Sequence, residues 1–263
     1  PTDDRDRQRS LNAISYLMRT PRNPLFYGIL ALLIVLGVLG WQTGWFVRTA
    51  YQAMIAMSDD GDSRLGLEAY RVDIDALRIA GVAENASGLT YHPERNSLFS
   101  VINRPPQIIE LGTDGTLRRT IAVQGVSDLE GITHVRGNQF FIADEGTQQL
   151  IHIEIDETQP VIDVKDRPRI GLALDQVRNL GFEGVSWDHS QKRLFVVKEK
   201  QPLRLLELSG FATLLDTQRI DLQIREWIPK SSTALLISDL SSLTYHEKSG
   251  NMLVLSDESR LVV

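Results

Sequence analysis

The chain has 263 residues and a formal net charge of −6; 42% of its residues are hydrophobic and 24% are charged. It contains no cysteine, which excludes disulfide bonds and cysteine-ligated metal sites. The acidic balance and the lack of a basic stripe with interleaved aromatic residues argue against a nucleic-acid partner. The length suffices for one large globular domain and an additional segment.

The N-terminal part of the chain has the pattern of a membrane anchor. Residues 1–24 carry five arginines against three aspartates, and residues 25–47 contain no charged residue. At about 1.5 Å per residue, a helix over residues 25–47 would extend ~34 Å, enough for a bilayer core of ~30 Å. Because basic flanks favour the cytoplasmic side, we predict a cytoplasmic tail (1–24), one transmembrane helix (25–47) and an exported C-terminal domain.

A cleavable signal peptide is the alternative interpretation of this segment. Such a peptide has an apolar core of about 7 to 15 residues, followed by a cleavage site of small residues. The apolar stretch here is longer, and residues 51–57 continue with a helical composition, which favours an anchor that is retained. Residues 48–63 end in a run of Ser, Asp and Gly and are predicted to form a linker.

A short motif recurs four times in the rest of the chain, at residues 85–91, 128–134, 181–187 and 239–245. A polar turn and an apolar run of β type follow each copy, so each copy begins a β-hairpin. The equivalent positions are 43, 53 and 58 residues apart, a spacing typical of propeller blades. These positions are Ser87, Glu130, Glu183 and Ser241.

These features predict an all-β fold, a five- or six-bladed β-propeller over residues 64–263 that is preceded by one N-terminal transmembrane helix. Only residues 260–263 follow the fourth hairpin, whereas the other copies continue into further strands. An incomplete sheet would expose an apolar edge, and the first residue is a proline. We therefore expect the sequence to be a fragment, truncated at the C-terminus, that lacks the rest of one blade and one more blade.

The hairpin geometry predicts which side chains meet at the mouth of the ring. In an up-and-down blade, the loop after the second strand lies beside the start of the first strand. The residues after the second strands are aligned as Asn103, Glu145, Glu199 and Glu258, and the residues before them as Ile102, Asp144, Lys198 and Asp257. If the repeats surround one axis, the carboxylates of these loops converge with those of the first strands.

Carboxylates that converge in a partly desolvated site require a positive partner. Lys198, Lys200 and Arg104 are internal candidates, and Ca²⁺ is the external one, because it prefers oxygen ligands. The predicted metal ligands are Glu130, Glu145, Glu183 and Glu199; the other predicted ligand-binding residues of the mouth are Asn103, Asp144, Lys198, Asp257 and Glu258. The alternative is that these acids cap turns or lie solvated on the rim.

Several short motifs follow one another in the C-terminal region: Leu67-Glu-Ala-Tyr-Arg71, Ser87-Gly-Leu-Thr-Tyr91, Asp128-Leu-Glu-Gly-Ile132, Asp144-Glu145, Phe182-Glu-Gly-Val-Ser-Trp-Asp188 and Val197-Lys-Glu-Lys-Gln-Pro202. In these motifs, from about residue 64 to its end, the chain resembles the SdiA-regulated family of bacterial membrane-anchored propeller proteins. The resemblance implies a periplasmic domain and an inner-membrane anchor, and it implies no defined activity. The Glu-Gly step at Glu130 and Glu183 also resembles calcium-dependent lactonase-type propellers, in which that glutamate is a metal ligand.

Two functions from different classes follow from this pattern. The first is a membrane-tethered binding module that presents the ring mouth to a small molecule, an envelope component or a partner protein. The second is a Ca²⁺-dependent hydrolase of the lactonase or phosphoesterase type, which needs a base near the metal. His134 is one candidate base, but its alignment with Tyr91, Trp187 and Tyr245 indicates a histidine of the core or channel. We therefore favour the binding module.

Overall fold

The structure is a computed structural model that describes residues 24–42, 44–57, 65–82, 84–171, 181–198, 203–211, 222–227, 237 and 239–263. The chain divides into two units, residues 1–49 and residues 50–263.

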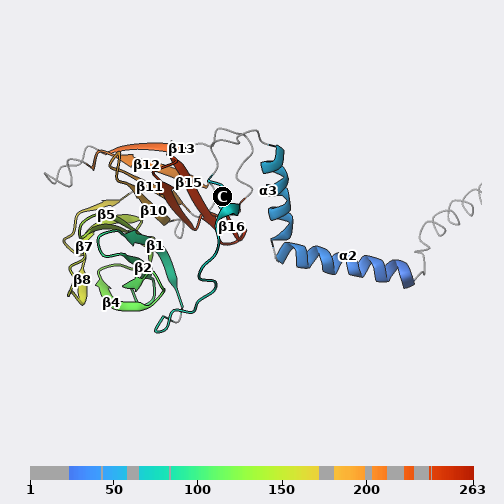
Figure 1. The fold of residues 1–263 in the computed structure, drawn as a ribbon, viewed down its shortest axis with the longest axis horizontal. Helices are drawn as coiled ribbons and strands as arrows, with labels where there is room; N and C mark the ends of the chain where they lie inside the picture. The colour runs from blue at the N-terminus through green and yellow to red at the C-terminus, as the bar shows by residue number, and fades with distance from the viewer. Residues whose placement is uncertain are drawn as a thin grey trace, which may run out of the picture. The chain divides into compact units, whose positions relative to one another are not determined.

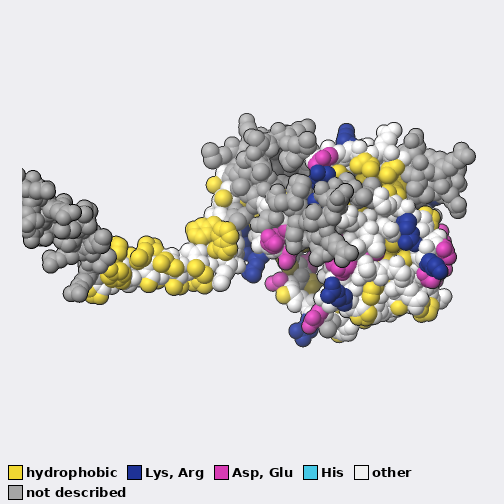
Figure 2. Space-filling view, turned by 180° about the vertical axis from the view of Figure 1, so that it is seen from behind, with side chains coloured by type: hydrophobic (Ala, Val, Ile, Leu, Met, Phe, Trp, Pro, Cys, Tyr) yellow, Lys and Arg dark blue, Asp and Glu magenta, His cyan; other side chains and the backbone are white. Residues whose placement is uncertain are grey.

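Two helices follow one another in the N-terminal region, α2 (Pro24–Gln42) and α3 (Trp45–Met57). By length and composition α2 can cross a membrane, and none of its residues is buried (Figure 2). A signal sequence near an N-terminus meets the same criteria. The helix expected over residues 25–47 is interrupted, because α2 ends at Gln42 and Gly44 takes the left-handed conformation, with a φ of 65°. Helix α3 extends through much of the predicted linker.

The remaining described residues form a short 3₁₀ turn, η1 (Leu67–Ala69), and four sheets, which we number as blades 1 to 4 in chain order (Figure 1). Blade 1 contains β1 (Ala86–His92), β2 (Ser97–Ile102), β3 (Gln107–Gly112), β4 (Leu117–Gln124) and β8 (Val161–Asp163). Blade 2 contains β5 (Leu129–Arg136), β6 (Gln139–Asp144), β7 (Gln149–Glu154) and β9 (Arg169–Gly171). Blade 3 contains β10 (Phe182–Asp188), β11 (Arg193–Lys198), β12 (Arg204–Ser209) and β13 (Gln223–Trp227), and blade 4 contains β14 (Ser242–His246), β15 (Asn251–Ser256) and β16 (Leu261–Val262).

Neighbouring blades share apolar cores, as they do in a propeller. Blades 1 and 2 enclose a cluster that includes Phe99 and Phe140. The next residue, Phe141, points to the other face of its sheet and joins Trp187 in the cluster between blades 2 and 3. Phe195 and the residues around it form the cluster between blades 3 and 4. A middle strand is therefore apolar on both faces, and every residue of β11 is buried.

The glycine of the repeated motif allows the first strands to approach one another closely. A Cβ atom at Gly88 would lie 2.8 Å from the backbone oxygen of Glu130, and one at Gly131 would lie 2.9 Å from that of Glu183. At Gly184 a Cβ atom would lie 2.8 Å from the backbone of Ser242 in blade 4. Each glycine thus faces the backbone of the following blade, and glycine at this position of the motif is a packing requirement of the ring.

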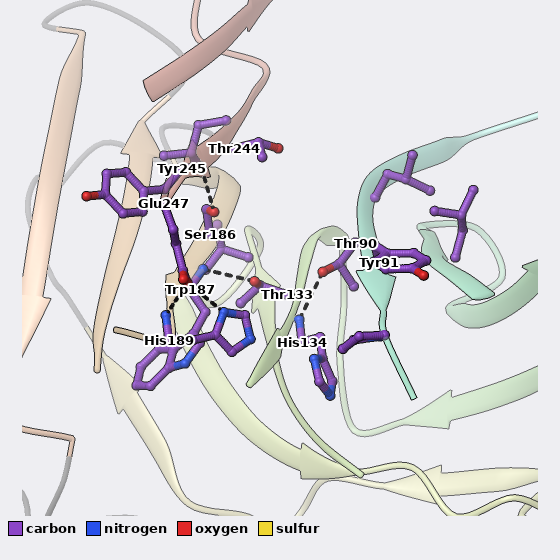
Figure 3. A pocket seen from close by; sticks show the side chains of 15 residues that line it. Thr90, Tyr91, Thr133, His134, Ser186, Trp187, His189, Thr244, Tyr245 and Glu247 are labelled. Carbon is purple, nitrogen blue, oxygen red and sulfur yellow. Dashed lines mark hydrogen bonds and ion pairs between the residues drawn. The ribbon is translucent and has the colours of Figure 1, made fainter. Parts of the chain in front are cut away.

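The hydroxyl residue two places after each glycine links the same strands. The backbone N–H of His134 donates to Thr90 Oγ1 at 3.0 Å, and that of Trp187 donates to Thr133 Oγ1 at 3.0 Å (Figure 3). The N–H of Tyr245 donates to Ser186 Oγ at 2.9 Å in the same way. These bonds order β1, β5, β10 and β14 side by side, so the motif encodes the contact between blades as well as the hairpin.

The predicted fold class is confirmed: the domain is a β-propeller, and an apolar helix lies near the N-terminus. The described residues form four blades, whereas five or six were predicted. The order of the blades around the ring follows from the contacts of β1 with β5, β5 with β10, and β10 with β14.

We expect the Gly184→Ala variant to lower the free energy of unfolding by about 1–3 kcal/mol, because the added methyl group would clash with backbone atoms that cannot move aside. Urea unfolding followed by tryptophan fluorescence measures this effect. Gly171→Ala is the control, because a Cβ atom there meets no atom within 4 Å, and it should change the stability by less than about 0.5 kcal/mol. Equal stability of the two variants would contradict this role of Gly184.

Candidate functional site

We call the end of the ring where the first strands of the blades begin the start end. The loop after each second strand was predicted to lie beside the start of the first strand there, and two blades show this arrangement. The N–H of Glu145 donates to the carbonyl of Asp128 at 2.8 Å, and the N–H of Asn103 donates to that of Asn85 at 3.3 Å. In each of these blades the loop after the second strand therefore lies against the start of the first strand.

Four oxygen-bearing side chains meet there, between blades 1 and 2. Asp128, Glu130 and Glu145 each direct one carboxylate oxygen to a common point, with these oxygens within 4.8 Å of one another. Asn103 joins them from blade 1 and donates from Nδ2 to Glu130 Oε1 at 2.9 Å. Among the described residues, Asn103 Oδ1 and Asp128 Oδ1 are buried and accept no hydrogen bond. This arrangement provides an oxygen cage with unused acceptors, which we call the oxygen cluster.

Two contacts of the oxygen cluster involve Arg104 and Gly181. One guanidinium nitrogen of Arg104 lies 3.8 Å from Asp128 Oδ2, and the Arg104 side chain is 76% exposed. The N–H of Gly181 approaches Glu145 Oε1 at 3.4 Å. An exposed guanidinium is a weak counterion, because water screens exposed ion pairs.

A second acidic group lies at the same end of the ring, around a cavity of about 630 Å³. Glu183, Asp257 and Glu258 line this cavity, together with Ser87 and Ser241. The sequence therefore identified most of the acidic residues that the start end brings together. It missed Asp128 as a member of the oxygen cluster, although Asp128 lies in the repeated motif. Glu199 lies outside the described residues.

The strand register corrects the alignment of the fourth repeat. Leu243 pairs with Val254 in blade 4, as Val185 pairs with Val196 in blade 3. Counting from these pairs, Asp257 is the equivalent of Glu145, and Glu258 lies one residue further along the loop. The alignment of Glu258 with Glu145 was wrong because it matched the Asp-Glu letters of the two loops, whereas pairing between strands fixes the position.

Asp144 and Lys198 occupy one position in their blades, at the end of the second strand, and both are 1% exposed. Asp144 accepts the N–H groups of Ser127 and Asp128 and the hydroxyl groups of Ser127 and Thr147, at 2.7–3.2 Å for the closest contacts. The carboxylate of Asp144 thus fastens the loop that carries Asp128. In blade 4, the carboxylate of Asp239, which precedes the first strand, accepts hydrogen bonds from the hydroxyl groups of Ser256 and Ser241. It thereby links the start of the first strand to the end of the second strand.

At the turn end of the ring, where the first strands run into their hairpin turns, histidines gather. A pocket of about 430 Å³ opens there, and His134, Trp187, His189 and Tyr245 line it (Figure 3). The rings of His134 and His92 lie 4.3 Å apart, and His189 Nδ1 lies 2.8 Å from Glu247 Oε1. The sequence predicted a buried His134, but it gave no role to the residues of the neighbouring turns.

Burial governs the protonation of these histidines. It lowers the pKa of His92, and the nearby charge of Arg95 lowers it further. Burial also lowers the pKa of His134, although a hydrogen bond to the carbonyl of Gly137 opposes the effect. Both imidazoles are therefore neutral at pH 7.

Other perturbed acids of the domain have internal partners. Burial alone would raise the pKa of Glu110, but hydrogen bonds from Arg119 and Ser97 outweigh burial and leave the pKa below its usual value. Asp188 behaves in the same way: hydrogen bonds from Ser190 and Arg193 outweigh burial and lower its pKa. These groups stabilise individual blades, so their shifted pKa values do not mark a ligand site.

The sequence pattern of the SdiA-regulated family matches residues 62–263. The chain belongs to the SdiA-regulated family. The resemblance seen in the short motifs is thereby confirmed.

Several solved structures resemble this SdiA-regulated chain at low identity. One is a chain of a nidogen/laminin complex, with 15% identity and a TM-score of 0.46; the match covers 65% of this chain and 56% of that one. Another is the streptogramin B lyase structure, with 10% identity and a TM-score of 0.40; the match covers 68% of this chain and 53% of that one. A third is the β-propeller domain of Myceliophteria thermophila Cps50 (Swd1), with 17% identity and a TM-score of 0.40; the match covers 69% of this chain and 52% of that one. The chain spans about half of the length of these proteins.

In this SdiA-regulated domain, Asp144→Ala should lower the free energy of unfolding by about 2–4 kcal/mol, because it leaves two backbone N–H groups and two hydroxyls without their acceptor. Chemical unfolding of the full chain in detergent measures the loss. Glu258→Gln, on the cavity rim, is the control and should stay within about 0.5 kcal/mol of the wild type. An Asp144→Ala variant as stable as this control would show that the loop does not depend on the carboxylate.

Proposed function

We propose that this protein is a membrane-anchored periplasmic binding module whose propeller holds a divalent cation, Ca²⁺, at the start end of the ring. The oxygen cluster carries the proposal. Ca²⁺ takes oxygen ligands at about 2.3–2.6 Å, so two ligands on opposite sides of one ion lie about 4.8 Å apart. The carboxylate oxygens of Asp128, Glu130 and Glu145 lie within that distance of one another.

The chemistry of the donor set fits Ca²⁺ better than it fits Mg²⁺ or a transition metal. The three carboxylates are hard ligands, and the three ligand atoms include neither nitrogen nor sulfur. Ca²⁺ also tolerates irregular coordination by six to eight ligands, so water or a bound molecule can complete the shell. The buried, unused oxygens of Asn103 and Asp128 would then gain a partner.

The adjacent cavity suggests what kind of molecule the module binds. Its wall combines acidic side chains, including Glu183 and Asp257, with the hydroxyl residues Ser87 and Ser241. Such a wall suits a polar ligand that presents hydrogen-bond donors, from a small molecule, an envelope component or a protein partner. An anionic group of the same ligand would be attracted to the cation.

The anchor supports the proposed location. Helix α2 follows five arginines and contains no charged residue, a pattern that favours a cytoplasmic N-terminus and an exported propeller in the bacterial inner membrane. The hydrolase remains the alternative; the contacts of Gly131 and Gly184 account for the glycine of the Glu-Gly step and leave the role of the glutamate to the metal.

We expect calorimetry on the full chain in detergent to detect Ca²⁺ binding that the Glu130→Gln/Glu145→Gln variant weakens at least tenfold, because the variant replaces two charged ligands by neutral amides. Glu154→Gln/Glu157→Gln, at exposed positions outside the oxygen cluster, is the matched control and should bind like the wild type. Equal isotherms for the two double variants would remove Ca²⁺ from this position. Chelator-sensitive turnover of lactones, aryl esters or phosphodiesters would favour the hydrolase instead.

The natural absence of cysteine makes the topology directly testable. In spheroplasts of a Gram-negative host, a membrane-impermeant maleimide should label Lys248→Cys, in an exposed turn of blade 4, and should not label Ser10→Cys. Detergent should make both positions reactive. Labelling of Ser10→Cys in intact spheroplasts would contradict the proposed orientation, and release of the labelled propeller into the soluble fraction would indicate a cleaved signal sequence.

A further inference from the structure

A second set of metal-ligating side chains lies at the turn end of the ring. His92 and His134, at the turn ends of the first strands of blades 1 and 2, and Glu94, in the turn after β1, each direct a donor atom to a common point. These atoms lie within 4.8 Å of one another. The set differs from the oxygen cluster in its chemistry, because two of its three donors are imidazole nitrogens.

The two histidines are unusual as packing residues. His92 is 1% exposed and His134 is 2% exposed. The rings of Phe99 and Phe140 both lie 5.8 Å from that of His92, and the ring of Phe140 lies 5.2 Å from that of His134. Among the described residues, His92 Nε2 and His134 Nδ1 are buried without a hydrogen-bond partner. The nitrogens that face Glu94 are the other two, His92 Nδ1 and His134 Nε2. An apolar residue would fill this space without leaving polar atoms unsatisfied, so packing alone does not account for a pair of imidazoles.

The distances suit a tetrahedral ion. Glu94 Oε2 lies 3.3 Å from His92 Nδ1 and 3.9 Å from His134 Nε2. Two ligands of a tetrahedral Zn²⁺, at about 2.0–2.2 Å from the metal, are separated by ~3.4 Å. The first distance already matches this separation. The second can shorten by a rotation of Glu94, whose side chain is 62% exposed and therefore free to adjust.

The hydrogen bonds that a metal would displace are replaceable. His92 Nδ1 accepts the N–H of Arg95 at 3.3 Å, which is a long contact. His134 Nε2 lies 2.9 Å from the carbonyl oxygen of Gly137, in an exposed turn where water can take over. The guanidinium of Arg95 donates to Asn138 Oδ1 at 2.7 Å and to the carbonyl oxygen of Ile155 at 2.9 Å, so these hydrogen bonds do not involve the proposed metal ligands.

We propose that His92, Glu94 and His134 form a Zn²⁺ site at the turn end of the propeller. Two imidazoles and one carboxylate are three protein ligands, which leaves the fourth position of a tetrahedral ion open to water or a ligand atom. His134 also lines the pocket of about 430 Å³ at this end. The site therefore gives the ring a second, chemically distinct binding end, with access for a group that coordinates zinc, such as a carboxylate.

The test uses the full chain in detergent, stripped of metal and titrated with Zn²⁺ against a chromophoric chelator in excess Ca²⁺, which keeps the oxygen cluster out of the measurement. We expect one Zn²⁺ per chain at ~10 μM protein, and a loss of affinity of about 10–100-fold in Glu94→Gln. This variant removes an exposed ligand and should leave the fold intact. Glu247→Gln is the matched control, because Glu247 is also an exposed glutamate paired with a histidine, and it should bind within about twofold of the wild type.

Cobalt substitution gives an independent readout. Co²⁺ bound to the wild type should show the visible absorption of a tetrahedral site, and the band should be absent from Glu94→Gln. The proposal is overturned if the wild type binds no Zn²⁺, if Glu94→Gln binds as tightly as the wild type, or if Glu247→Gln is the variant that loses the ion. None of these outcomes depends on Ca²⁺ binding at the oxygen cluster.

Discussion

The close approach of the first strands is the constraint on which the rest of the propeller depends. Glycine at one position allows the backbones to touch, and a Thr or Ser hydroxyl two residues later accepts an N–H group from the following blade. Both contacts repeat between successive pairs of blades. They bring residues far apart in sequence to the same height in the ring, so side chains from several blades gather at each end of it.

The two ends differ in chemistry because the first strands begin and finish with different residues. At the start end the loops supply carboxylates and an amide, which suit a hard cation. At the turn end the strands supply imidazoles and aromatic rings. Buried aspartates such as Asp144 and Asp239 stabilise the loops of the start end through hydrogen bonds. Acidic residues a few positions apart therefore differ in role, because some hold loops and others form the oxygen cluster.

Much of the fold could be predicted from the sequence, since the motif repeats at blade-like spacing and its hairpins are local. The convergence of Glu130, Glu145 and Asn103 was also predictable, because it follows from hairpin geometry alone. The contribution of Asp128 was not, because its participation depends on how Asp144 holds the loop. The fourth repeat was misaligned by one residue because letter matching took the place of strand pairing. Glu94 was missed because its proximity to His134 arises only when two blades pack together.

The strand β8 has a consequence for how the domain is completed. It pairs in parallel with β4 of blade 1, although it lies in the connection that follows β7 of blade 2. The outer edge of the first sheet therefore stays uncovered until a segment almost forty residues further along has been synthesised and has folded back. If the exported domain emerges from a translocation channel in chain order, blade 1 cannot be completed before the segment that follows β7 of blade 2 has emerged, and the two blades mature as one cooperative unit.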